Sequence, residues 1–76
     1  MLYDSLPSFI KSKRRTLGLT QPQLAFKAGV GLRFIRELES GKETLRMDKV
    51  NQVLKLFGCG LGPVILDRNT LFNEQG

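Results

Sequence analysis

Apolar side chains recur at helical spacing in four separate segments of the chain, with polar residues between them. Recurrence at every third or fourth residue places such side chains on one face of a helix. The spacing predicts helices over residues 5–17, 21–28, 31–40 and 47–57. The apolar positions that carry the four patterns are Leu6, Phe9, Ile10 and Leu17; Leu24, Ala25 and Ala28; Leu32, Ile35 and Leu38; and Val50, Val53, Leu54 and Phe57. We therefore expect a mostly α, compact four-helix domain.

The ends of these segments carry residues that typically begin and end helices. Thr20 and Gln23 have the spacing of a capping box before the second helix, and Ser5 or Asp4 can cap the first. Asp48 falls in the first turn of the fourth helix, where the helix dipole favours an acid. The glycines that follow the four segments are Gly18, Gly29, Gly41 and Gly58. These signals agree with the predicted boundaries.

The second and third helices are joined by a short turn of sequence Gly-Val-Gly. A helix-turn-helix needs a small residue where the helices cross, a glycine for positive φ in the turn, and branched apolar residues on the inner face. The residues that meet these needs are Ala25, Gly29, Val30, Ile35 and Leu38. In that motif the second helix can enter the major groove of DNA. Residues 21–40 therefore predict a helix-turn-helix whose recognition helix is residues 31–40.

The composition changes after Phe57. The run GCGLGPVILD contains three glycines and a proline before Val64, Ile65 and Leu66. It predicts a flexible exit that leads into a short β-strand. We interpret residues 1–58 as a DNA-binding domain and residues 59–76 as a C-terminal strand and tail that serve dimerisation.

The formal net charge of the 76 residues is +5, and its distribution is uneven. Residues 1–47 hold nine Lys/Arg against four acids, so 9 − 4 = +5, whereas residues 48–76 hold three of each. A basic part joined to a neutral part suggests one surface for a polyanion and another for structure or a partner. Charge that serves solubility alone is the alternative.

The residues that most catalytic and metal sites use are scarce in this chain. It has no histidine and a single cysteine, Cys59, and its seven acids show no paired spacing. The glycines around Cys59 precede the predicted strand, whereas a nucleotide-binding loop follows a strand and opens a helix. We therefore expect no enzyme activity, cofactor, metal or small-molecule ligand. One cysteine, no signal peptide and no apolar run long enough for a membrane span predict a cytoplasmic protein, nucleoid-associated when bound to DNA.

The segment LGLTQPQLAFKAGVGLRFIRELESGK, followed by DKVNQVLKLFG, resembles the lambda-repressor-like Xre family of bacterial and phage DNA-binding proteins. The resemblance covers about residues 6–58. Within that family the chain is most similar to HipB-like antitoxins, which repress their own operon and carry a C-terminal strand that pairs across a dimer. The resemblance implies an autoregulatory repressor that binds a palindromic operator as a homodimer. It also implies a HipA-like kinase toxin as a possible partner.

The resemblance also implies roles for individual residues. Positions matching DNA contacts of the family are Thr20, Gln21, Gly31, Leu32, Arg33, Arg36, Glu37 and Lys42. Those expected to serve dimerisation are Leu61, Val64, Ile65 and Leu66. Arg14 and Glu39 match an ion pair between the first and third helices. Arg33 is expected to bind guanine, and Glu37 to accept from a cytosine amino group.

Several alternatives remain open at this stage. Arg33 and Glu37 can be an ordinary exposed ion pair at i,i+4, and Gln21 can serve only as a capping side chain. Leu32 fits the rim of the core as well as a thymine methyl, and we expect Phe34 to pack. A protein-interaction antitoxin, whose main role is to hold the toxin, is the alternative function. RNA binding ranks below both because the basic face has few aromatic residues for stacking.

Overall fold

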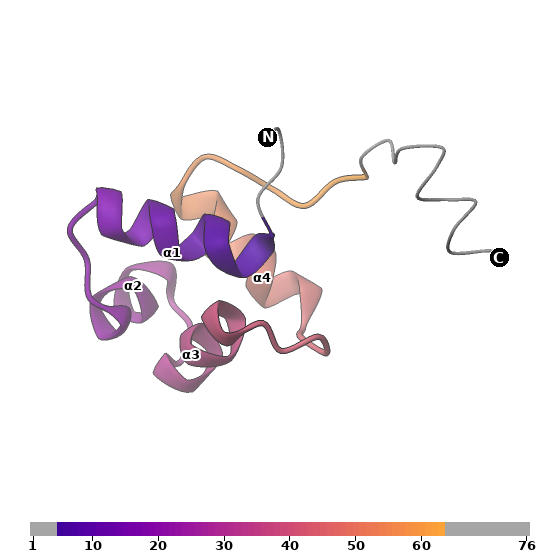
Figure 1. The fold of residues 1–76 in the computed structure, drawn as a ribbon, viewed down its shortest axis with the longest axis horizontal. Coiled ribbons are helices and arrows are strands. Elements are labelled where there is room, and N and C mark those ends of the chain that lie inside the picture. Colours follow the sequence, from indigo (N-terminus) through magenta and orange to yellow (C-terminus); the bar gives the residue numbers. More distant parts are fainter. Residues whose placement is uncertain (1–4, 64–76) are drawn as a thin grey trace, which may run out of the picture.

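The computed structural model describes residues 5–63, which fold into four helices. They are α1 (Leu6–Thr16), α2 (Gln21–Ala28), α3 (Leu32–Ser40) and α4 (Met47–Leu56). Helix α3 packs against both α1 and α2, and α2 packs against α4 (Figure 1). No helix within the described residues is long and apolar enough to cross a membrane.

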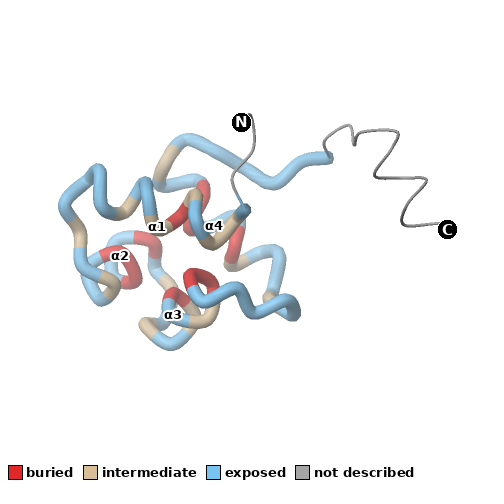
Figure 2. Tube along the Cα trace, viewed as in Figure 1, coloured by how far each residue is buried: buried red, intermediate tan, exposed pale blue. Residues whose placement is uncertain are grey.

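The inward faces of the four helices meet in one small core, as the buried segments in Figure 2 show. The fully enclosed side chains are Ile10, Leu24, Ile35, Leu38 and Val53. All of them belong to the apolar patterns that the sequence predicts. Burial of each such side chain stabilises the fold by about 1.5–3 kcal/mol.

The helix boundaries agree with the predicted ones to within one residue. Ser5 caps α1, since its Oγ accepts the N–H of Ser8, and Thr20 and Gln23 form the complete capping box of α2. Leu17, which follows the helical spacing of the first apolar pattern, does not join the core. It is the C-cap of α1 and is 55% exposed, because beyond the last turn the helical periodicity no longer directs a side chain inward.

The turn between α2 and α3 consists of residues 29–31. Gly29 has a φ of 74°, in the left-handed region that favours glycine, whereas Gly31 is extended, with a φ of −73°. Gln52 of α4 donates to the carbonyl oxygens of Ala28 and Gly29, at 2.9 and 3.0 Å. Val30 packs against the core. The turn is therefore fixed by hydrogen bonds from α4 and by the packing of Val30 against the core.

The chain turns back after α4 at Gly58, whose φ is 75°. The Leu61 N–H donates to Asn51 Oδ1, at 2.8 Å, which keeps residues 59–61 beside α4. No strand occurs among residues 5–63. The strand predicted from Val64 to Leu66, and with it the expected pairing across a dimer, lies outside the described residues.

Candidate nucleic-acid interface

Helix α3 has two chemically different faces. Ile35, Leu38 and Glu39 are buried against the other helices, whereas Arg33 and Arg36 are exposed. Because each residue turns the helix by 100°, these positions divide between opposite sides of it. The exposed side of α3 therefore presents two guanidinium groups from an element whose other side is fixed.

Glu37 lies between two cations at the edge of this exposed face. Its Oε2 is 3.4 Å from Arg33 Nε, one turn earlier, and 3.3 Å from Lys42 Nζ, just after the helix. The Arg33–Glu37 pair that the sequence left as an alternative is thus present in the structure. Such exposed pairs contribute only about 0.2–1 kcal/mol each to stability. A phosphate or another competing anion can therefore displace the carboxylate from its cations.

A hollow beside α3 gathers further basic residues. We call it the basic hollow; its lining comprises Gly31, Arg33, Phe34, Glu37, Lys42, Thr44, Leu45, Arg46 and Lys49. The sequence reasoning did not single out Thr44, Arg46 and Lys49, since the fold brings them to α3 from the following loop and the start of α4. Arg46 is also paired with Asp48, at 2.6 Å. The hydrogen bond from Arg46 holds the pKa of Asp48 below its ordinary value.

The first turn of α3 opens toward the same hollow. Gly31 is its N-cap and offers no side-chain oxygen. The N–H groups of Leu32, Arg33 and Phe34 have no acceptor within residues 5–63. Unpaired donors and the helix dipole make such an end suited to an anion. The side chains of Leu32 and Phe34 themselves are partly buried and pack against the core.

The start of α2 is largely occupied by internal hydrogen bonds. Thr20 Oγ1 accepts from the Gln23 N–H and the Thr20 N–H donates to Gln23 Oε1. Gln21 Nε2 donates to Glu39 Oε1, at 3.1 Å. An amide nitrogen carries two hydrogens, so Gln21 retains one more donor besides its backbone N–H. The donors that Thr20 and Gln21 can still offer to a phosphate are therefore those two N–H groups of Gln21 and the hydroxyl hydrogen of Thr20.

The expected pair of Arg14 and Glu39 joins α1 to α3 in two hydrogen bonds. Arg14 Nε and Nη2 lie 2.7 and 3.1 Å from the two Glu39 carboxylate oxygens, and Nη1 donates to the Leu19 carbonyl at 2.9 Å. Only 13% of the Arg14 side chain and 2% of the Glu39 side chain are exposed. Burial alone would raise the pKa of Glu39, but hydrogen bonds from Arg14 and Gln21 outweigh it and lower the pKa. This pair orients α3 from its buried side.

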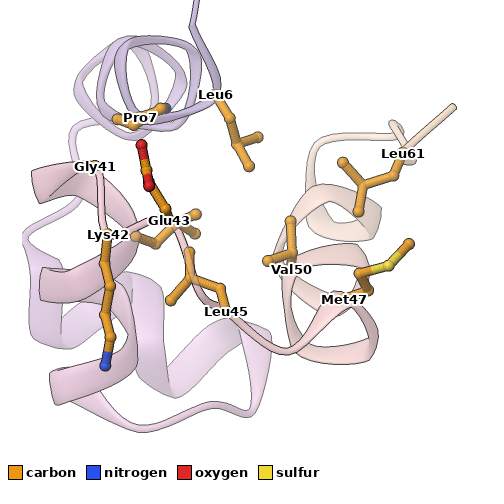
Figure 3. Close-up of a pocket in the computed structure, with 10 residues that line it drawn as sticks. Leu6, Pro7, Gly41, Lys42, Glu43, Leu45, Met47, Val50 and Leu61 are labelled. Carbon is orange, nitrogen blue, oxygen red and sulfur yellow. The ribbon is translucent and has the colours of Figure 1, made fainter. Parts of the chain in front are cut away.

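A second, apolar surface lies on another part of the molecule. A groove of about 240 Å³ is bounded by α1, the loop after α3 and α4. Figure 3 shows Leu6 and Val50 facing each other across it, with Leu61 at its outer end. Leu61 is 41% exposed and Met47, on the same rim, is 68% exposed. Of the four residues expected to serve dimerisation, Leu61 therefore lies at an apolar groove, and the other three lie outside the described residues.

Two short helices joined by a tight turn, with the second held against a small core and exposed along its polar face, define a helix-turn-helix. A family model described as "Helix-turn-helix" matches residues 10–64. A protein named "Uncharacterized HTH-type transcriptional regulator y4mF", from Sinorhizobium fredii (strain NBRC 101917 / NGR234), is 46% identical over 54 residues, which cover 71% of each chain. The chain belongs to the helix-turn-helix family.

Proposed function

We propose that this protein is a sequence-specific repressor of transcription that binds double-stranded DNA with α3 in the major groove. The observation that carries the proposal is the asymmetry of α3, which is fixed by buried contacts on one side and presents Arg33 and Arg36 on the other. The family and the name of the relative support the same class of function.

Base readout would come from three positions on α3. The Arg33 side chain is 92% exposed and can donate two hydrogen bonds to guanine O6 and N7. Glu37 can accept from a cytosine amino group. Leu32 has only part of its side chain free of the core, and this part can contact a thymine methyl. Each good base contact discriminates against the wrong base by about 1–3 kcal/mol.

Phosphate contacts would come from both sides of α3. On one side lie the N–H groups after Gly31 and the cations of the basic hollow, Lys42 and Lys49. On the other side lies Gln21, with one side-chain N–H and one backbone N–H, next to Thr20. Such contacts position the helix and carry no sequence information themselves. Arg36 is exposed on α3 outside the hollow, where it can reach a phosphate or a neighbouring base.

We further infer that two copies bind together, with the apolar groove as the interface of a homodimer. The described chain ends at Pro63, two residues beyond Leu61 on the groove, and Val64, Ile65 and Leu66 follow it directly. In the sequence this apolar run directly follows the part of the chain that lines the groove, and we expect both to serve the same interface. A shared patch of this kind gives a closed two-fold dimer, which matches a palindromic operator with half-sites about 34 Å apart.

The dimer is tested by sedimentation of the full chain. Met47→Glu places a charge on the rim of the groove and is expected to dissociate the dimer. Leu56→Glu, at an exposed apolar position outside the groove, is the matched control and is expected to leave it intact. A wild-type chain that sediments as a monomer at all accessible concentrations would refute the dimer.

An autoregulatory antitoxin is the finer form of the proposal, and a module that chiefly holds a HipA-like kinase toxin is its alternative. The neutral C-terminal part, with three basic and three acidic residues in 48–76, offers a surface separate from the basic one. The two functions are distinguished by whether a variant that cannot bind DNA still neutralises the toxin. If the Arg33→Ala variant no longer represses transcription yet still neutralises a co-expressed kinase encoded by the neighbouring gene, toxin holding does not depend on DNA binding.

DNA binding is tested by selecting sites from a random duplex pool and measuring fluorescence anisotropy on the selected and a scrambled duplex. Arg33→Ala is expected to lose at least tenfold in affinity for the selected duplex, about 1.4 kcal/mol. Lys55→Ala removes the same charge from the last turn of α4, outside the hollow, and serves as the control. Equal losses in the two variants would show that only general electrostatics acts.

A further inference from the structure

One carboxylate oxygen holds two of the cations that the DNA-binding face offers. Glu37 Oε2 is shared by Arg33 on α3 and Lys42 in the following loop. The Glu37 side chain is 28% exposed, whereas those of Arg33 and Lys42 are 92% and 47% exposed. Of the acids in residues 5–63, it is the one that lines the basic hollow.

This arrangement lowers the binding free energy that a duplex gains when it approaches α3. A phosphate that pairs with Arg33 or Lys42 must either share the cation with Glu37 or displace Glu37 from it, and in both cases it lies near the carboxylate. Like charges at short range oppose binding, and an interface that repels the wrong partners gains specificity from that repulsion. A duplex that places a cytosine amino group at Glu37 gives the carboxylate a new partner, whereas other duplexes do not.

We propose that Glu37 is a specificity-determining residue that weakens binding to non-cognate DNA by occupying Arg33 and Lys42 in the free protein. This inference rests on the proposed DNA-binding function and goes beyond it. A favourable contact to one base is the smaller part of the role of Glu37. The larger part is a loss of affinity for every duplex that cannot replace the two ion pairs.

The decisive variant is Glu37→Gln, measured on the selected and the scrambled duplex across a salt series. It keeps the size of the side chain and leaves Arg33 and Lys42 without their shared anion. Loss of two exposed ion pairs is expected to tighten binding to the scrambled duplex by about 2- to 30-fold. The logarithmic salt dependence steepens by up to about 1.8, since each added phosphate contact contributes about 0.9. The ratio of selected to scrambled affinity falls.

Glu43→Gln is the matched control because it changes the net charge by the same amount. Glu43 forms no ion pair with any residue in the described part of the chain. Figure 3 shows its side chain directed toward α1 and that of Lys42 directed the opposite way. We expect this variant to tighten binding to both duplexes by less than about twofold, because Glu43 does not line the basic hollow and its charge is screened by salt.

A second variant tests the pairing itself. Lys42→Gln is made in the wild type and in Glu37→Gln, and its effect on the scrambled duplex is compared between the two backgrounds. The loss is expected to be several-fold larger in Glu37→Gln, where Lys42 is free to bind phosphate. Equal losses, or equal gains from Glu37→Gln and Glu43→Gln, overturn the inference while DNA binding stands. Failure of the wild type to bind any duplex overturns the proposed function and the inference with it.

Discussion

Removal of the Arg14 guanidinium is the sharpest test of how the fold holds its recognition helix. In Arg14→Ala, Glu39 keeps the hydrogen bond from Gln21 but loses both bonds from α1, and the Leu19 carbonyl loses its donor. The carboxylate stays enclosed, because only 2% of its side chain is exposed. A buried charge without its partner is the main cost of the substitution.

The magnitude follows from the burial of the pair. Breaking a buried pair by removal of one partner costs about 3–5 kcal/mol. The remaining bond from Gln21 favours the lower end, and the lost bond to Leu19 adds about 1 kcal/mol. A chain of this length has a free energy of unfolding of roughly 4–11 kcal/mol. The substitution therefore removes a large part of the total stability.

Urea unfolding followed by far-ultraviolet circular dichroism measures this cost. With a slope of about 1 kcal/mol per molar, a loss of about 4 kcal/mol is expected to lower the midpoint by roughly 4 M. Arg15→Ala, an exposed neighbour in the same turn of α1, is the control and should stay within about 0.5 kcal/mol of wild type. Arg14→Met with Glu39→Leu removes both charges and should recover most of the loss. Equal effects of Arg14→Ala and Arg15→Ala would refute the reasoning.

Three further predictions concern the same core and its turn. The lowered pKa of Glu39 means that its carboxylate contributes fully to stability above the unfolded pKa of about 4.3, and that this contribution is lost as the pH falls through the folded pKa. The free energy of unfolding, measured across an acid titration, should fall over this range. The variant Glu39→Gln should lack this fall. Leu38→Ala, at a fully enclosed position, should cost about 2–5 kcal/mol in urea unfolding, and a loss under 1 kcal/mol would contradict the core assignment. Gly29→Ala should cost about 1–2 kcal/mol, because the φ is 74° and the new Cβ would lie 3.0 Å from Gln52 Nε2. Gly31→Ala, with an ordinary φ and open space, is its control.

The helices and the core were predictable because their signals are local. Apolar spacing and capping residues such as Ser5 and Thr20 act within one or two turns, so a reading of the chain finds them. Leu17 shows where this ends. It lies at the right spacing for the core, but the helix stops before it and the residue stays 55% exposed.

Contacts between distant segments were less accessible from the sequence. Gln52 donates to the carbonyl oxygens of Ala28 and Gly29, which precede it by 24 and 23 positions. In the sequence of its own helix it is one of several polar residues and carries no signal of this contact. Arg46 and Lys49 likewise reach the basic hollow only because α4 begins beside α3. The Arg14–Glu39 pair, 25 positions apart, was anticipated through a family resemblance and not through any local pattern.

The two acids of α3 show why residue type alone did not decide their roles. Glu37 and Glu39 are two positions apart, which turns them by about 200° and places them on opposite sides of the helix. Glu39 meets Arg14 and Gln21 in the interior and orients the helix, whereas Glu37 meets Arg33 and Lys42 at the surface, the cations that we propose contact DNA. Because the two groups share no partner, their effects should separate. Neutralising Glu39 is expected to lower the stability of the fold, and neutralising Glu37 is expected to lower the discrimination between duplexes.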